Sequence, residues 1–169
     1  MAFRALLLLS LCGLIHGKIV VVDNMSELRE LWEDRSAAPR QGYQRGVAAV
    51  GFQFDRGIMW SVICDSKHGM VPGKMDSKGE AWYPFGGREF GCPKVTKVVS
   101  GALYRWDQKL PGNCKAQGRQ NDSGYYHSAL IQSAAHGLVP GKAKRTGRKA
   151  WYCWGGKEYY VRSNFYILC

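Results

Sequence analysis

The hydrophobic pattern beyond residue 50 consists of short apolar runs separated by glycines. Ile58–Cys64 and Tyr125–Ile131 are aromatic and β-branched runs that each follow a glycine, which is typical of buried strands. Lys97–Trp106 and Tyr159–Leu168 alternate between apolar and polar residues and predict further strands. The pattern therefore predicts an all-β protein.

Two kinds of turn signal punctuate these runs. Gly86-Gly87 and Gly155-Gly156 predict tight hairpins, because a two-residue turn needs positive φ at its central positions. Val71–Lys74 and Val139–Lys142 both read Val-Pro-Gly-Lys and predict type II turns, with Pro presetting φ and Gly tolerating positive φ. The lysine that ends each turn is then expected to begin the next strand on the outside of the molecule.

The beginning of the chain has a different pattern. A basic residue, Arg4, precedes an apolar run over 5–14 and a small residue at Gly17, which predicts a secretory signal peptide over 1–17, with an N-terminal anchor as the alternative. Residues 18–31 are expected to form an N-terminal extension. Ser26–Asp34 places Leu28, Leu31 and Trp32 on one helical face behind a serine cap and predicts a short helix.

The chain contains an internal repeat. Three blocks return in the same order 67, 68 and 69 residues later: Gln53–Gly57 as Gln120–Gly124, His68–Lys74 as His136–Lys142, and Ala81–Glu89 as Ala150–Glu158. Two-stranded hairpins are marginal alone, so two copies are expected to share a core. We therefore predict two homologous units, 32–105 and 106–169, related by a pseudo-two-fold axis.

The order of these motifs resembles the DM-nine (DM9) repeat. Each copy has a Trp and then a Pro (Trp32 and Pro39, Trp106 and Pro111), followed by Gly-x-x-Pro-Gly-Lys and Gly-Gly-(Lys/Arg)-Glu. The resemblance covers about 32–169 and implies a pair of small antiparallel β-sandwiches. Its best-understood members are mannose-binding lectins of invertebrate innate immunity, and other members belong to natterin-like toxins.

The resemblance also implies sugar-binding residues. In the lectins the ligands are the Lys of Pro-Gly-Lys and an acidic residue at a Gly-x-(acid) step. Here the acidic position holds glutamine, and a carboxylate recurs two residues later on the same side of a strand. Apolar residues near Ile63 and Leu130 replace the family's usual Arg. The candidate carbohydrate-binding residues are therefore Gln53, Asp55, Lys74, Gln120, Asp122 and Lys142.

The chemistry of these side chains suits a sugar. A sugar ring offers hydroxyl groups, which need fixed donors and acceptors, and an apolar face, which packs on an aromatic plane. Four tryptophans are candidate planes, with burial in the core as the alternative: Trp60, Trp82, Trp151 and Trp154. Glu89 and Glu158 are expected to pair with nearby basic residues. The first hypothesis is therefore a secreted lectin that binds glycans non-covalently.

The charge supports a second hypothesis. The chain has 24 Lys and Arg against 13 Asp and Glu, a net charge of +11, or +10 without Arg4 of the predicted signal. A basic cluster follows Lys142: Lys144, Arg145, Arg148 and Lys149. Such a patch can bind anionic polysaccharide or an acidic membrane surface. A toxin-like role, as in natterins, is a third class, and we exclude nucleic acid because no nucleic-acid fold signature accompanies the charge.

The cysteines and the glycosylation sequons indicate the compartment of the protein, and the motif content indicates whether it has a metal site or an enzyme activity. Without Cys12, five cysteines remain (Cys64, Cys92, Cys114, Cys153 and Cys169), which predicts two disulfides of open connectivity and one unpaired thiol. Asn24 and Asn121 begin glycosylation sequons. We expect no metal, cofactor or enzyme activity, because neither metal-ligand spacing nor a catalytic motif is present. A second copy of the chain is a candidate partner.

Overall fold

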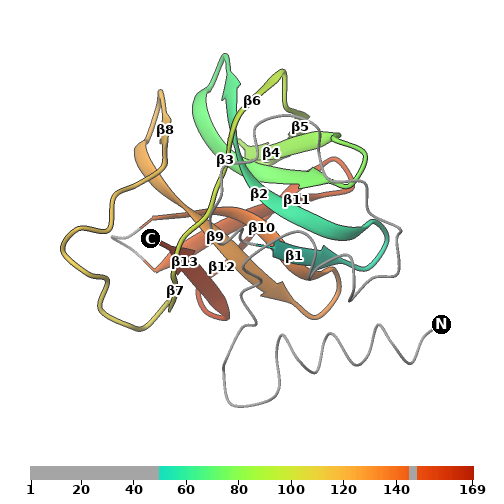
Figure 1. Ribbon diagram of the computed structural model, residues 1–169. Helices are drawn as coiled ribbons and strands as arrows, with labels where there is room; N and C mark the ends of the chain where they lie inside the picture. Colours follow the sequence, from blue (N-terminus) through green and yellow to red (C-terminus); the bar gives the residue numbers. More distant parts are fainter. Residues whose placement is uncertain (1–49, 145–147) are drawn as a thin grey trace.

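The structure is a computed structural model that describes residues 50–144 and 148–169 (Figure 1). Every regular element in these residues is a β-strand, which confirms the all-β prediction. The signal peptide, the helix at 26–34, Trp32, Pro39, Asn24 and Arg145 lie outside the described residues. The strands are β1 Val50–Gln53, β2 Gly57–Ser66, β3 Gly69–Asp76, β4 Ala81–Phe85, β5 Arg88–Gly91, β6 Lys94–Val98, β7 Leu103–Arg105, β8 Gly118–Gln120, β9 Gly124–Ser133, β10 Gly137–Lys144, β11 Lys149–Trp154, β12 Lys157–Val161 and β13 Phe165–Leu168.

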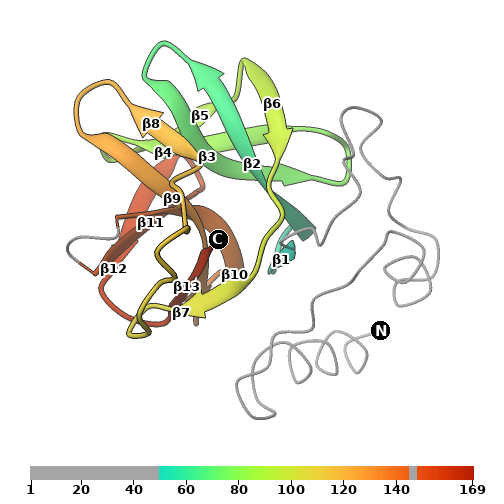
Figure 2. The same cartoon turned by 60° about the vertical axis from the view of Figure 1, so that its left-hand side comes forward.

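The strands form one antiparallel sheet that closes into an eight-strand barrel. Around the ring the order is β2, β1, β10, β11, β12, β5, β4 and β3, and the pairing of β2 with β3 completes the closure. The other five strands lie outside this ring (Figures 1 and 2): β6 pairs with β2, β8 with β3, and β9 with β10, while β13 pairs with β9 and β7 pairs with β13. Closure leaves none of the eight ring strands with an unpaired edge.

The two halves, 50–105 and 106–169, exchange strands with each other. At one junction β1 pairs with β10, where Gln53 lies opposite Gly137. At the equivalent junction β8 pairs with β3, where Gln120 lies opposite Gly69. A third contact joins β5 to β12. Strands far apart in sequence therefore hold the barrel together, and the separate sandwich for each half stays a prediction.

The predicted type II turns at Val-Pro-Gly-Lys are wrong. Both segments lie in the middle of long strands, β3 and β10, with Lys74 opposite Ser61 and Lys142 opposite Ser128. The glycine is needed for close approach rather than for a turn, since a Cβ on Gly73 would lie 2.2 Å from the carbonyl oxygen of Trp82. Both lysines therefore project from the centre of the sheet and do not begin a strand.

The other turn signals behave as expected. Gly86 and Gly87 have φ values of 57° and 84° and join β4 to β5, and the equivalent glycines join β11 to β12. The alternating segment 97–106 contributes to two strands, β6 and β7, rather than to one. β7 pairs with β13 of the second half, so the chain crosses between the halves before residue 106.

Each half has its own apolar cluster. In the first half it contains Val62, Val71 and Tyr83, and in the second their equivalents Ala129, Val139 and Tyr152. A third cluster joins the halves through Ile63 and Leu130. Disulfides link Cys64 to Cys92 and Cys114 to Cys169, and Cys153 is a buried free thiol. The predicted count of two disulfides and one unpaired thiol is confirmed.

Candidate functional site

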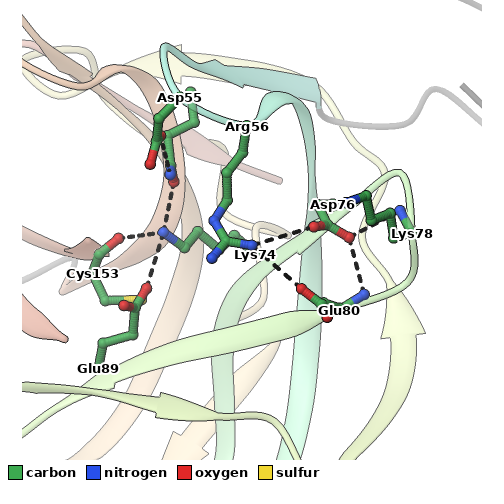
Figure 3. A network of polar contacts seen from close by, with 9 residues as sticks. Asp55, Arg56, Lys74, Asp76, Lys78, Glu80, Glu89 and Cys153 are labelled. Carbon is green, nitrogen blue, oxygen red and sulfur yellow. Dashed lines mark hydrogen bonds and ion pairs between the residues drawn. The ribbon is translucent and has the colours of Figure 1, made fainter. Parts of the chain in front are cut away.

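Lys74 lies inside the barrel and not on its surface. Its side chain is 1% exposed. The ammonium Nζ donates to Gln53 Oε1 at 2.6 Å and to the carbonyl oxygen of Cys153 at 2.5 Å, and it pairs with Glu89 Oε1 at 3.1 Å (Figure 3). The expectation of an exposed lysine was wrong. Val-Pro-Gly-Lys lies at the centre of a strand, and the Lys74 side chain is long enough to reach partners from both halves.

Lys142 repeats this arrangement in the second half. Its side chain is 3% exposed, and Nζ donates to the carbonyl oxygen of Pro84 at 2.6 Å and pairs with Glu158 Oε1 at 3.0 Å. Pro84 is the equivalent of Cys153, so each lysine reaches a backbone carbonyl of the other half. Burial lowers the pKa of Lys142, and the charge of Glu158 offsets only part of this effect.

Glu89 and Glu158 also cross between the halves. Oε2 of Glu89 accepts from the backbone N–H of Gly156 at 2.8 Å, and Oε2 of Glu158 accepts from that of Gly87 at 2.7 Å. The predicted pairing of both glutamates with a basic residue is confirmed; the partners are Lys74 and Lys142, and both pairs are buried. Each carboxylate therefore links the lysine of its own half to the glycine hairpin of the other half.

The buried glutamines connect this interior to two exposed carboxylates. Gln53 Nε2 donates to Asp55 Oδ1 at 2.7 Å, and Gln120 Nε2 donates to Asp122 Oδ1 at 3.2 Å. Both aspartates are exposed, whereas both glutamines are buried. In the first half the structure thus joins the predicted residues in a chain from the interior Lys74 to the surface carboxylate of Asp55. In the second half Gln120 contacts Asp122 but does not accept from Lys142.

Hydrogen bonds hold both carboxylates in their ionised form. Partial burial by itself would raise the pKa of Asp55, but hydrogen bonds from Gln53 and Trp154 lower it below its usual value. For Asp122 the main cause of a lowered pKa is the hydroxyl of Ser123, which donates to Oδ1 at 2.6 Å. Each site therefore presents a fixed negative acceptor to solvent.

A stacked histidine from the opposite half lies beside each carboxylate. His136 stacks on Trp154 with ring centroids 4.2 Å apart and interacts electrostatically with Asp55. His68 stacks on Phe85 at 3.8 Å and interacts in the same way with Asp122. Each site is therefore made from both halves of the chain.

The two histidines were missed by the sequence analysis as site residues. Each accepts or donates a hydrogen bond at 3.0 Å with a tyrosine hydroxyl, Tyr83 for His68 and Tyr152 for His136. Burial lowers the pKa of both. The available signal was their place at the start of the repeated His-Gly-x-Val-Pro-Gly-Lys block.

The four candidate tryptophans have different positions. Trp60 is fully buried and belongs to the core. Trp82 is covered by the Arg56 guanidinium at 4.3 Å, and Trp151 packs edge-on against Tyr126. Trp154 is half-buried and contacts both His136 and Asp55, which makes it the tryptophan placed at a candidate site.

The described residues of the basic cluster lie at the connection between β10 and β11, where the equivalent connection between β3 and β4 carries acids. In the first half Arg56 pairs with Asp76 at 3.5 Å and with Glu80 at 3.4 Å (Figure 3). The equivalent positions of Asp76 and Glu80 are Lys144 and Lys149, and Lys144 lies 5.2 Å from the Tyr126 ring centroid. Arg148 is exposed and lies 5.9 Å from the Trp106 ring.

Asn121, the candidate for glycosylation, is exposed in the turn between β8 and β9. Its Nδ2 donates to the carbonyl oxygen of Lys67 at 3.1 Å. It immediately precedes Asp122, so the sequon and the second candidate site share one turn.

No family model matches this chain, and a search of curated proteins finds no match either. Within residues 50–144 and 148–169, no helix is long and apolar enough to cross a membrane. The same residues contain no group of three His, Cys, Asp or Glu side chains placed to hold a metal ion.

Proposed function

We propose that this protein is a carbohydrate-binding protein that recognises glycans through two equivalent surface sites. The observation that carries the proposal is the repeated pairing of an exposed carboxylate from one half with a stacked histidine and aromatic ring from the other. Asp55 lies with His136 and Trp154, and Asp122 lies with His68 and Phe85.

This arrangement has the two features that a neutral sugar requires. An ionised carboxylate accepts strong hydrogen bonds from hydroxyl groups, and an aromatic plane packs against the apolar face of the ring. Exposed aromatic side chains next to each turn add apolar surface, with Phe54 49% and Tyr125 69% exposed. Lys74 and Lys142 would act from beneath as positioning residues, because neither ammonium group reaches the surface.

The proposal also includes the repeat family of the chain and its secretion. Duplicated junctions between β1 and β10 and between β8 and β3 support an internal tandem repeat. Its assignment to the DM-nine repeat, with a pair of small β-sandwiches, belongs to this proposal. The two disulfides are compatible with a secreted protein. Mannose-type sugars and a role in innate immune recognition follow from the resemblance, and a homodimer also belongs to this proposal.

A titration with methyl α-mannoside tests the proposed function, with other neutral monosaccharides as a panel. Each net hydrogen bond contributes only about 1 kcal/mol, so we expect weak affinity at each site that hardly changes with salt. The double variant Asp55→Asn/Asp122→Asn should lose most binding. Asp107→Asn alters an exposed carboxylate in the segment after β7, where it pairs with Arg105, and should bind normally. Absence of binding by the unaltered protein to every sugar would refute the proposal.

A second candidate function is the binding of anionic polysaccharide. It is supported by the exchange of Asp76 and Glu80 in the first half for Lys144 and Lys149 in the second. We expect Lys144→Glu/Lys149→Glu to abolish retention on a heparin column, and retention of the unaltered protein to fall steeply with salt. Asp76→Lys/Glu80→Lys is the matched variant and should increase retention. A toxin-like role remains a prediction of the resemblance.

A further inference from the structure

The interior of the first half brings together an amine, a carboxamide and a carboxylate. Lys74 Nζ lies 2.6 Å from Gln53 Oε1 and 3.1 Å from Glu89 Oε1 (Figure 3). Lys74 and Gln53 are each 1% exposed, and the Glu89 side chain is 13% exposed. Water therefore has little access to the point where the three groups meet.

We propose that Lys74 and Gln53 form an intramolecular isopeptide bond, with Glu89 as the proton acceptor. The proposal does not depend on the proposed function. The electrophilic Cδ of Gln53 is one bond from the Oε1 atom that Nζ already contacts. Holding two reactive groups at this distance converts a bimolecular reaction into an intramolecular one. The effective molarity of well-oriented groups reaches about 10⁵ M or more.

Glu89 supplies the step that a protonated lysine requires. An ammonium group has no lone pair, so one proton must first pass from Nζ to Glu89 Oε1. Nζ and Oε1 are 3.1 Å apart, so the proton can pass directly between them without a bridging water. The carbonyl oxygen of Cys153, at 2.5 Å from Nζ, accepts another N–H and fixes the direction of the amine.

The reaction is balanced without any further reagent. The Nζ lone pair attacks Cδ of Gln53, the new C–N bond forms, and the bond from Cδ to Nε2 breaks. A second proton from Nζ goes to Nε2, which leaves as ammonia, and Glu89 returns its proton to give ammonium. Nε2 contacts the exposed carboxylate of Asp55 at 2.7 Å, so the leaving group starts on the solvent side of the site.

The second half is an internal control for this chemistry. Lys142 and Glu158 are paired in the same way, but Gln120 Oε1 has no hydrogen-bond partner and so is not in contact with Lys142. Ser123 replaces Arg56 in the repeat, and its hydroxyl takes a hydrogen bond from Gln120 Nε2 at 3.1 Å. We therefore expect one bond in the chain and not two.

The test is the intact mass of the purified, fully reduced protein, followed by a peptide map. We expect a mass below that calculated for the polypeptide after signal cleavage by one ammonia molecule, about 17 Da, and a tryptic product in which the peptide of Gln53 is joined to that of Lys74. A mass equal to the calculated one would overturn the proposal, and so would an equal deficit that maps to any other residue. Both measurements use the unaltered protein, so the test does not depend on the folding of any variant.

Three variants then assign the roles. Lys74→Met and Glu89→Gln should each restore the full mass, the first by removing the amine and the second by removing the proton acceptor. Lys142→Met should keep the deficit of about 17 Da, because the second half does not form the bond. Persistence of the cross-linked peptide in Glu89→Gln would refute the role of Glu89.

Discussion

At the scale of single residues, the buried pair of Lys142 and Glu158 is an interaction that is costly to disrupt. Glu158→Gln keeps the shape of the side chain but leaves the Lys142 ammonium without its counter-charge. Removing one partner of a buried pair costs about 3–5 kcal/mol, and the remaining carbonyl contact from Pro84 places this variant near the lower end. The free energy of unfolding in urea measures the loss.

Glu80→Gln is the control for that measurement. Glu80 also pairs with a basic residue, Arg56, but its side chain is 61% exposed. Exposed pairs contribute only about 0–1 kcal/mol, so this variant should unfold almost as the unaltered protein does. Equal losses for the two variants would mean that the Lys142 pair is solvated and not buried.

The two stacked histidines make stability depend on pH. Burial lowers the pKa of His68 and His136 below the usual value of 6.5, so the unfolded chain binds more protons than the folded chain just below that pH. Stability is therefore expected to fall as the pH drops below about 6.5, by at most about 1.4 kcal/mol per pH unit for each histidine.

Unfolding in urea between about pH 5 and pH 7.5 tests this expectation. The lowered pKa values of Asp55 and Asp122 affect stability only below their usual value of 3.8, so they do not interfere in this range. His68→Gln/His136→Gln should flatten the profile. A slope that is unchanged in the double variant would assign the pH dependence to other groups.

At the scale of elements, the glycines of Val-Pro-Gly-Lys determine how closely the strands approach. A Cβ on Gly73 would lie 2.2 Å from the Trp82 carbonyl oxygen, and one on Gly141 would lie 2.1 Å from that of Trp151. Because the clashing atom belongs to the backbone, the neighbouring strand has to move. Gly73→Ala should therefore cost about 3 kcal/mol or more, at the upper end of what overpacking costs.

Gly91→Ala is the matched control for this substitution. Gly91 also lies in a strand, β5, but a Cβ there meets no atom within 4 Å, and its φ is not positive. Thermal unfolding of the two variants makes the comparison. A small loss for Gly73→Ala, similar to that for Gly91→Ala, would show that β3 and β4 can separate without penalty.

Strand identity was accessible from the sequence because burial on both faces leaves apolar runs, as in Ile58–Cys64 of β2. The glycine hairpins were accessible because only glycine readily takes positive φ at both positions, as at Gly86 and Gly87. The turn predicted at Val-Pro-Gly-Lys was wrong because the same residues suit a turn locally and a close strand contact in the folded protein. That distinction depends on the neighbouring strand β4, which no local pattern specifies.

The candidate site could be predicted only in part for the same reason. The repeat identified Asp55 and Asp122 as equivalent, but their aromatic partners come from the opposite half. His136 reaches Asp55 because β1 pairs with β10, a contact between residues more than 80 positions apart. Pairings at that separation carry no periodic signal in a single sequence, so the burial of both lysines also remained hidden.

At the scale of the whole molecule, the exchange of strands makes the two halves interdependent. The strand pairings that join the two halves are β1 with β10, β5 with β12, β3 with β8 and β7 with β13. A half expressed alone exposes unpaired strand edges and the joining cluster of Ile63 and Leu130. We therefore expect neither half to be stable alone.

Two fragments cut after Ser100 test this expectation, because that cut keeps β7 with its partner β13. Each fragment should give the narrow amide dispersion of an unfolded chain in NMR spectra, and the intact protein should unfold in one cooperative transition. Mixing the fragments should restore the dispersed spectrum if the junctions supply the missing pairings. Two independently folded fragments would instead mean that each half is a complete domain, and that the shared sites form only when two finished domains dock.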